Sequence, residues 1–166
     1  MRILGVDPGS VVTGFGVIDS ERGRLSLVEQ GVIRTRRDAE LPERLAQIYE
    51  GLGEVMVRTS PQAVAVETPF AGKNVKSLIQ LAHARGVILL AVRAAGVEFF
   101  EYSPRSVKSA VVGYGAAEKE QVAKMVRMLI PGITSVRLVA DAADALAIAI
   151  CHAHTAATAS RLKIRA

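Results

Sequence analysis

Four acidic residues adjoin apolar segments, where a carboxylate is costly unless a positive charge compensates it. They are Asp7, Glu67, Asp141 and Asp144. The first two each end a short apolar run typical of a buried strand, and the last two, three residues apart, precede the apolar segment 145–150. Carboxylate oxygens are preferred ligands of Mg²⁺, and such a site suits phosphoryl chemistry. The four acids predict a divalent-cation site if the fold brings them together.

Each acid also has a simpler explanation. An Asp before Pro-Gly commonly caps a turn, and Asp7 precedes Pro8 and Gly9. Acids in the first turn of a helix interact favourably with its dipole, and Asp is a strong N-cap. That explanation accounts for one of Asp141 and Asp144 more readily than for both. Four carboxylates that converge without a cation would repel one another, so convergence of all four favours the metal site.

The hydrophobic pattern predicts the elements that position these acids. Strands 3–7 and 11–18 form a hairpin, and if strand 63–67 runs parallel beside the first, Asp7 and Glu67 emerge at the same sheet edge. The other expected elements are strands 25–35 and 97–102, helices 41–59, 75–95, 117–129 and 141–157, and a short helix from 104. This order predicts an α/β fold with a five-stranded mixed sheet flanked by helices on both faces. We expect one domain, residues 1–158, and a basic, frayed tail at 159–166.

Composition narrows the class of protein. The 166 residues suffice for one domain with a sizeable core, and half of them are hydrophobic, which argues against disorder. Lys and Arg outnumber Asp and Glu by 21 to 16, which favours a polyanionic partner such as nucleic acid. The single cysteine, Cys151, excludes an intrachain disulfide and fits a reducing compartment. With no signal-peptide pattern and no apolar run of membrane-spanning length, we expect a cytoplasmic protein that does not enter a membrane.

A set of motifs in one order resembles a known family. They are Gly5-Val6-Asp7-Pro8-Gly9-Ser10, Thr13-Gly14-Phe15-Gly16-Val17-Ile18, Ala65-Val66-Glu67, Phe70-Ala71-Gly72-Lys73-Asn74, Ala84-Arg85-Gly86-Val87, Glu101-Tyr102, Val107-Lys108, Ala117-Glu118-Lys119, Met125-Val126-Arg127 and Asp141-Ala142-Ala143-Asp144. Together they resemble the RuvC-type Holliday junction resolvases, nucleases of the ribonuclease H-like superfamily. Any one of these motifs alone would be weak, but they run in family order from residue 1 to about 154.

The resemblance implies a function and a set of site residues. Members of this family are homodimeric endonucleases that nick two opposing strands of a four-way DNA junction in recombination and repair. They leave 5′-phosphate and 3′-hydroxyl ends and work with the RuvA–RuvB branch-migration complex. The resemblance makes Asp7, Glu67, Asp141 and Asp144 the catalytic ligands of two Mg²⁺ ions, with Mn²⁺ as a substitute. It also implies DNA contacts by Lys108 and Lys119, base stacking by Phe70, and further contacts by Lys73, Asn74, Lys76 and Arg85.

Three other functions remain open on the sequence. Actin-like ATPases and sugar kinases also begin with a strand, Asp and a glycine turn, but they need two such domains and this chain is too short for two. A ribonuclease H-like nuclease acting on RNA is a second alternative, and a junction-binding protein without catalysis is a third. We also predict that helix 75–95 forms a dimer interface through Leu78, Ile79, Leu81 and Ala82, with Gly86 allowing a partner helix to approach closely.

Overall fold

The computed structural model describes residues 1–68, 74–133 and 138–165, with side chains up to Ala159. Its single sheet has the strand order β3-β2-β1-β4-β5. The strands are β1 (Arg2–Asp7), β2 (Val12–Glu21), β3 (Arg24–Arg34), β4 (Ala63–Glu67) and β5 (Glu98–Tyr102). The helices are α1 (Leu41–Thr59), α2 (Val75–Ala94), α3 (Pro104–Val112), α4 (Lys119–Leu129) and α5 (Ala140–Arg165). The predicted mixed five-stranded sheet is confirmed.

Strand β1 lies at the centre of the sheet and joins its two halves. It pairs antiparallel with β2, with Asp7 opposite Gly14, so the predicted hairpin is confirmed. It pairs parallel with β4, with Val6 beside Val66. The strands β1 and β4 therefore end together, as their apolar runs predicted.

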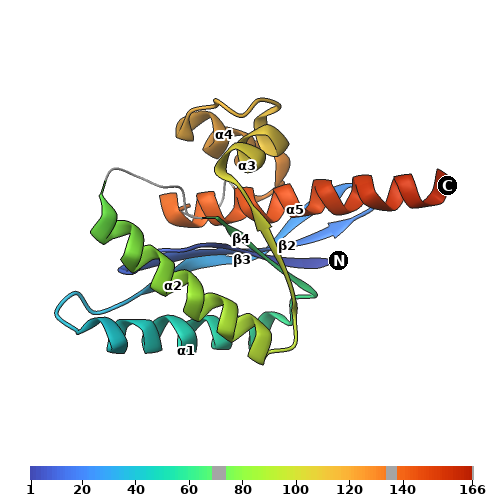
Figure 1. Ribbon diagram of the computed structural model, residues 1–166. Helices are drawn as coiled ribbons and strands as arrows, with labels where there is room; N and C mark the ends of the chain where they lie inside the picture. Colours follow the sequence, from blue (N-terminus) through green and yellow to red (C-terminus); the bar gives the residue numbers. More distant parts are fainter. Residues whose placement is uncertain (69–73, 134–137, 166) are drawn as a thin grey trace.

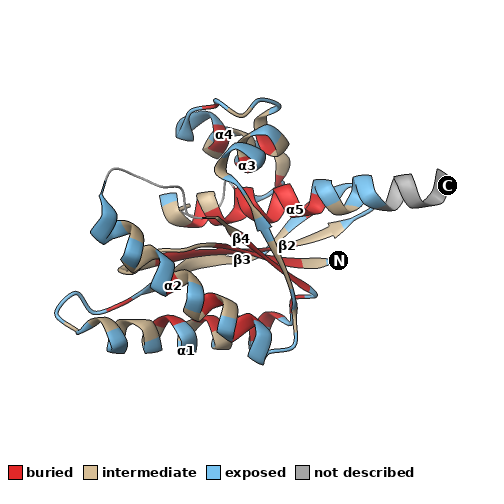
Figure 2. Cartoon of the chain, viewed as in Figure 1, coloured by how far each residue is buried: buried red, intermediate tan, exposed pale blue. Residues whose placement is uncertain are grey.

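Helices cover both faces of the sheet. Helices α1 and α2 lie on one face, and α5 lies across the other with α3 and α4 outside it (Figure 1). The buried residues follow this arrangement, because they lie in the strands and on the helix sides that face them (Figure 2). One apolar cluster joins β1 and β4 to α1 and α2, and includes Leu4, Leu52 and Ile88. A hydrophobic core on each face therefore holds the strand ends in place.

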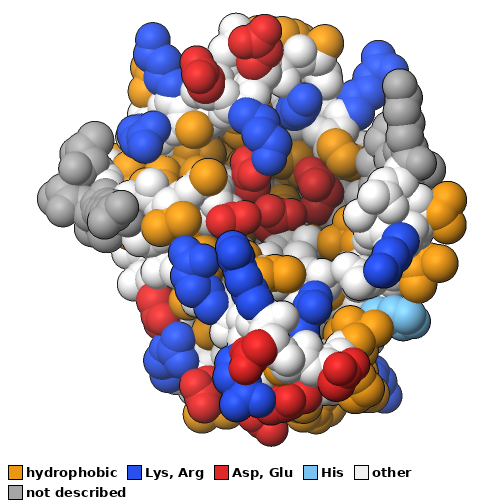
Figure 3. Space-filling view, turned by 90° about the vertical axis from the view of Figure 1, so that its left-hand side faces the viewer, with side chains coloured by type: hydrophobic (Ala, Val, Ile, Leu, Met, Phe, Trp, Pro, Cys, Tyr) orange, Lys and Arg blue, Asp and Glu red, His pale blue; other side chains and the backbone are white. Residues whose placement is uncertain are grey.

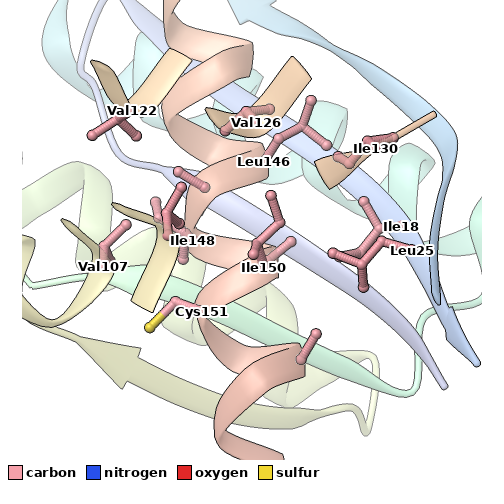
Figure 4. Close-up of a cluster of buried hydrophobic side chains, with 14 of the residues drawn as sticks. Ile18, Leu25, Val107, Val122, Val126, Ile130, Leu146, Ile148, Ile150 and Cys151 are labelled. Atoms are coloured by element: carbon pink, nitrogen blue, oxygen red, sulfur yellow. The ribbon is translucent and has the colours of Figure 1, made fainter. Parts of the chain in front are cut away.

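The second core surrounds α5, whose segment from Ala142 to Ala153 is almost wholly buried (Figure 4). Leu146, Ile148 and Ile150 pack there against Val107 of α3, Val126 of α4 and other apolar side chains. Each such fully buried aliphatic side chain contributes roughly 1.5–3 kcal/mol. The helix can approach the sheet closely because Gly5 has no side chain. A Cβ at this position would lie only 2.0 Å from the carbonyl oxygen of Ala145. The packing thus fixes α5, and the acids in its first turns, directly on β1 and β2.

Cys151 and His152 of α5 are packing residues. Cys151 is buried, and burial raises the pKa of its thiol to about 11. His152 is also buried, its Nδ1 lies 2.8 Å from the Tyr102 hydroxyl, and its ring centroid lies 4.2 Å from that of Phe100. Burial lowers the pKa of His152, which keeps the ring neutral. These residues join α5 to β5.

Two elements differ from the expectation. Helix α5 begins at Ala140 and continues to Arg165, beyond the end predicted near Ala157. Helix α2 is long and apolar enough to cross a membrane by length and composition alone, with only 22% of its most apolar window buried. The sequence pattern did not reveal this because Gln80, His83 and Arg85 divide the helix into short apolar runs. The exposed apolar surface of α2 is therefore a feature to explain.

Candidate active site

Two of the four acids are placed by neighbouring parallel strands. Asp7 ends β1 and Glu67 ends β4, and the residues before them, Val6 and Val66, are register partners. Both carboxylates emerge at the carboxyl edge of the sheet and are partly buried. This edge is where ligands of α/β sheets collect.

The other two acids are placed by α5. A Cβ at Gly14 would lie 2.1 Å from the carbonyl oxygen of Asp141, so the first turn of α5 rests on the β2 backbone at that point. Since Gly14 is also the register partner of Asp7, the same glycine brings Asp141 toward Asp7. Asp144 lies one turn further along α5, on the same helix side. Three elements, β1, β4 and α5, thus bring the four acids to one end of the sheet.

The pKa values show that these carboxylates interact. Burial, followed by the negative charges of Asp144 and Glu67, raises the pKa of Asp7 to about 7 from the ordinary 3.8. Burial and the charge of Asp144 also raise the pKa of Glu67. A buried acid surrounded by acids favours its neutral form unless a positive charge is supplied. The site is therefore short of positive charge.

Two lysines supply part of that charge. The Lys119 ammonium, at the start of α4, lies 2.9 Å from a carboxylate oxygen of Asp144 and donates a hydrogen bond to it. This contact raises the pKa of Lys119, and the lysine charge in turn opposes the pKa rise of Asp7 and Glu67. Lys108, in α3, also opposes the pKa rise of Glu67. The structure thus places both predicted lysines beside the acids.

The donor set suits a hard divalent cation. It consists of carboxylate oxygens alone, which Mg²⁺ prefers, and a divalent charge would offset the burial and the mutual repulsion that together raise the pKa of Asp7. Among residues 1–68, 74–133 and 138–165, however, no three Asp, Glu, His or Cys side chains lie close enough to hold an ion. One of the four, Asp144, is instead paired with Lys119. The residues fit the ion in chemistry and location, and binding requires their side chains to draw together.

A clamp on the turn after Asp7 was not predicted. Arg44 of α1 donates two hydrogen bonds, from Nε and Nη2, to the carbonyl oxygen of Ser10 at 3.0 and 2.8 Å. The Thr35 hydroxyl donates to the same oxygen at 3.1 Å, and the Thr13 hydroxyl donates to the carbonyl oxygen of Gly9 at 2.8 Å. The turn that carries Asp7 is thereby fixed to α1 and to β2. No local pattern signalled Arg44, because the contact spans 34 residues.

The remaining predicted DNA contacts lie at different places. Asn74 caps α2 by accepting a hydrogen bond from the Ser77 amide at 3.2 Å, and Lys76 is exposed in the first turn of that helix. Arg85 forms an ion pair with Glu101 of β5, so its positive charge is balanced within the protein. Phe70 and Lys73 lie outside the described residues. DNA contact by these residues stays a prediction.

The surface at this end of the sheet carries both acidic and basic side chains. Figure 3 faces it and shows acidic side chains gathered in a central hollow, with Lys and Arg side chains above and below them. Basic side chains of this kind hold phosphates without regard to sequence. An acidic centre with a basic rim can bind a polyanionic backbone and also hold a cation against it.

Comparison with known proteins identifies the family. Residues 3–152 match the family described as crossover junction endodeoxyribonuclease RuvC. The crossover junction endodeoxyribonuclease RuvC of Chloroflexus aggregans is 48% identical over 164 residues, which cover 99% of each chain. Thermus thermophilus RuvC in complex with Holliday junction substrate is 36% identical, with a TM-score of 0.89 over 96% of each chain.

A more distant structure shares the fold alone. The yeast mitochondrial Holliday junction resolvase Ydc2 is 13% identical, with a TM-score of 0.68 over 93% of this chain and 80% of its own. The close match to Thermus thermophilus RuvC confirms the expected ribonuclease H-like fold. With its sheet order, its acid-lined edge and these sequence matches, the chain belongs to the RuvC family of crossover junction endodeoxyribonucleases.

Proposed function

We propose that this protein is an endodeoxyribonuclease that resolves four-way DNA junctions with Mg²⁺ bound by Asp7, Glu67, Asp141 and Asp144. The observation that carries the proposal is the arrival of these acids from β1, β4 and α5 at one edge of the sheet, where burial and, after it, the charges of Asp144 and Glu67 raise the pKa of Asp7 to about 7. Membership of the RuvC family supports a Holliday junction as the substrate. Nothing in the donor set discriminates strongly against Mn²⁺, which would bind the same oxygens.

The acids and the lysines would have different roles in phosphodiester hydrolysis. A bound divalent cation would activate the attacking water and stabilise the charge on the leaving oxygen. Asp7, held by the β1 register and by the clamped turn after it, and Glu67 provide fixed oxygens at the sheet edge. Asp141 and Asp144 close the site from α5. Lys108 and Lys119 would hold the phosphates on either side of the cut, so the protein contributes positioning and charge neutralisation.

Two symmetric cuts require two such sites, and α2 offers a surface for pairing them. Val75, Ile79 and Leu90 expose 67%, 51% and 62% of their surface along one side of the helix, and Gly86 on that side has open space. Its other side, with Ala84 and Ile88, is buried in the core. A helix that is apolar all round is normally buried all round. We propose that a second copy covers the exposed side and that the protein is a homodimer.

One further partner is proposed from membership of the RuvC family and not from the geometry of the site. RuvA–RuvB, the branch-migration complex, is the proposed partner of the junction-bound dimer. A cytoplasmic location is proposed because the substrate is DNA. The apolar side of α2 is better explained by a dimer than by a membrane, because Arg85 is paired with Glu101 of β5 and the opposite side is part of the core.

A substrate comparison tests this function against its alternatives. A synthetic four-way junction, a linear duplex of the same sequence and an RNA–DNA hybrid are incubated with the protein in Mg²⁺ and in EDTA. The proposal predicts paired cuts in the junction in Mg²⁺, and intact duplex and hybrid. Cutting of the hybrid would support a ribonuclease instead, and binding of the junction without any cut would support a non-catalytic junction-binding protein.

A further inference from the structure

Lys119 connects α4 to the acidic site. It is the first residue of α4, and its ammonium lies 2.9 Å from the Asp144 carboxylate, 25 residues away. A cation at a helix N-terminus is unfavourable for the helix dipole, so helix stability does not explain a lysine there. The acids do, because the same ammonium interacts favourably with Asp7 and Glu67 as well as Asp144.

Lys119 therefore acts as a partial substitute for a metal ion. It brings one positive charge to a site that lacks charge compensation, and it occupies an oxygen of a proposed metal ligand. Its side chain is nevertheless 83% exposed, whereas that of Asp144 is 29% exposed. Exposed ion pairs are weak, so this one opens at small cost and leaves a lysine that is free to reach solvent or DNA.

We propose that Lys119 exchanges between two partners, Asp144 in the cation-free protein and a DNA phosphate once a divalent cation has bound. This inference rests on the proposed metal-dependent function. Cation binding takes Asp144 away from Lys119 and makes the ammonium available to a phosphate. By linkage, a phosphate that engages Lys119 strengthens cation binding by the same factor. Lys119 is thus a positioning residue that couples metal binding to DNA binding.

The exchange is tested on the DNA-free protein with Mn²⁺ as the probe. Free Mn²⁺ is measured by electron paramagnetic resonance for wild type, Lys119→Gln, Lys119→Arg and Lys124→Gln at constant ionic strength. Lys124 is the matched control, because it is an exposed lysine of the same helix without a carboxylate partner among the described ion pairs. We expect Lys119→Gln to bind Mn²⁺ roughly two- to fivefold more tightly, the range expected from losing an exposed ion pair. Lys119→Arg and Lys124→Gln should stay near wild type.

A second measurement follows the lysine itself. The side-chain ammonium resonance of Lys119 is assigned by its absence from Lys119→Gln and is followed as Mg²⁺ is added to wild type. Loss of the Asp144 contact should shift or broaden that resonance at the Mg²⁺ concentration at which the ion binds. The Lys124 resonance should not move.

The outcomes separate this inference from the proposed function. Equal Mn²⁺ affinity in wild type and Lys119→Gln, or Mg²⁺ binding that leaves the Lys119 resonance unmoved, would overturn the exchange and leave the metal-dependent function standing. A wild-type protein that binds neither Mn²⁺ nor Mg²⁺ would overturn both.

Discussion

At the scale of single residues, the buried acid Asp7 dominates the behaviour of the site. Its pKa is about 7 in the folded protein, raised from the ordinary 3.8. Between about pH 4 and 7, Asp7 is therefore protonated in the folded protein and ionised in the unfolded chain. The free energy of unfolding should therefore fall as pH rises through this window. Above it, the ionised carboxylate destabilises the cation-free fold.

Asp7→Asn should remove this cost because the amide is uncharged and of similar shape. In EDTA at pH 8 we expect the variant to be more stable than wild type, by on the order of a few kcal/mol. At pH 4, where Asp7 is neutral in the fold, that extra stability should be gone. Urea unfolding at both pH values measures the difference. A stability difference between variant and wild type that does not change with pH would contradict the pKa assigned to Asp7.

Some of these residues could be placed from the sequence alone, and others could not. Asp7 and Glu67 were predictable as neighbours, provided that their strands run parallel side by side, because each ends a short apolar run typical of a buried strand. The pair at Asp141 and Asp144 was predictable from its three-residue spacing. The contacts of Lys119 with Asp144 and of Arg44 with Ser10 were not predictable from local pattern, because 25 and 34 residues separate the partners. The side-chain exchange proposed for Lys119 therefore depends on a contact that the local sequence pattern does not indicate.

At the scale of elements, the contact between α5 and β2 determines whether the four acids meet. A Cβ at Gly14 would lie 2.1 Å from a backbone oxygen of Asp141, and a rigid helix end cannot move aside without taking Asp141 and Asp144 with it. The sheet order could be predicted from the strand pattern. The close approach of Asp141 to Gly14 could not, because a small residue in a strand does not indicate which helix packs against it.

Gly14→Ala should therefore weaken Mn²⁺ binding strongly, by about tenfold or more, and should destabilise the fold by roughly 1–3 kcal/mol. Gly53→Ala is the matched control, because Gly53 lies within α1 and a Cβ there meets no atom within 4 Å. That change should leave Mn²⁺ affinity unaltered and raise stability by about 0.5–1 kcal/mol. Calorimetric titration and thermal unfolding give both quantities. Wild-type Mn²⁺ affinity in Gly14→Ala would show that α5 does not position the site.

At the scale of the whole molecule, α2 has two apolar sides, of which the fold buries only one. Ile79→Glu should place a charge in the proposed dimer interface and give a monomer in sedimentation at micromolar concentration, where we expect wild type to be a dimer. Met128→Glu is the control, because Met128 is a similarly exposed apolar residue, at 67%, and lies on α4, on the other face of the sheet from α2. It should leave the dimer intact. A monomeric wild type with or without junction DNA would count against the interface.

We propose that four acids from three elements hold the cation with which the protein cuts the junction. The most direct measurement maps the cuts on a synthetic four-way junction in Mg²⁺ and EDTA for wild type, Asp7→Asn, Glu67→Gln, Asp141→Asn and Asp144→Asn. Wild type should cut two opposing strands at symmetric positions in Mg²⁺ alone. Each variant should lose at least about 100-fold in cutting and still bind the junction, because it loses a ligand charge and keeps the fold. Wild-type cutting in EDTA, or near-normal cutting by all four variants, would contradict the claim.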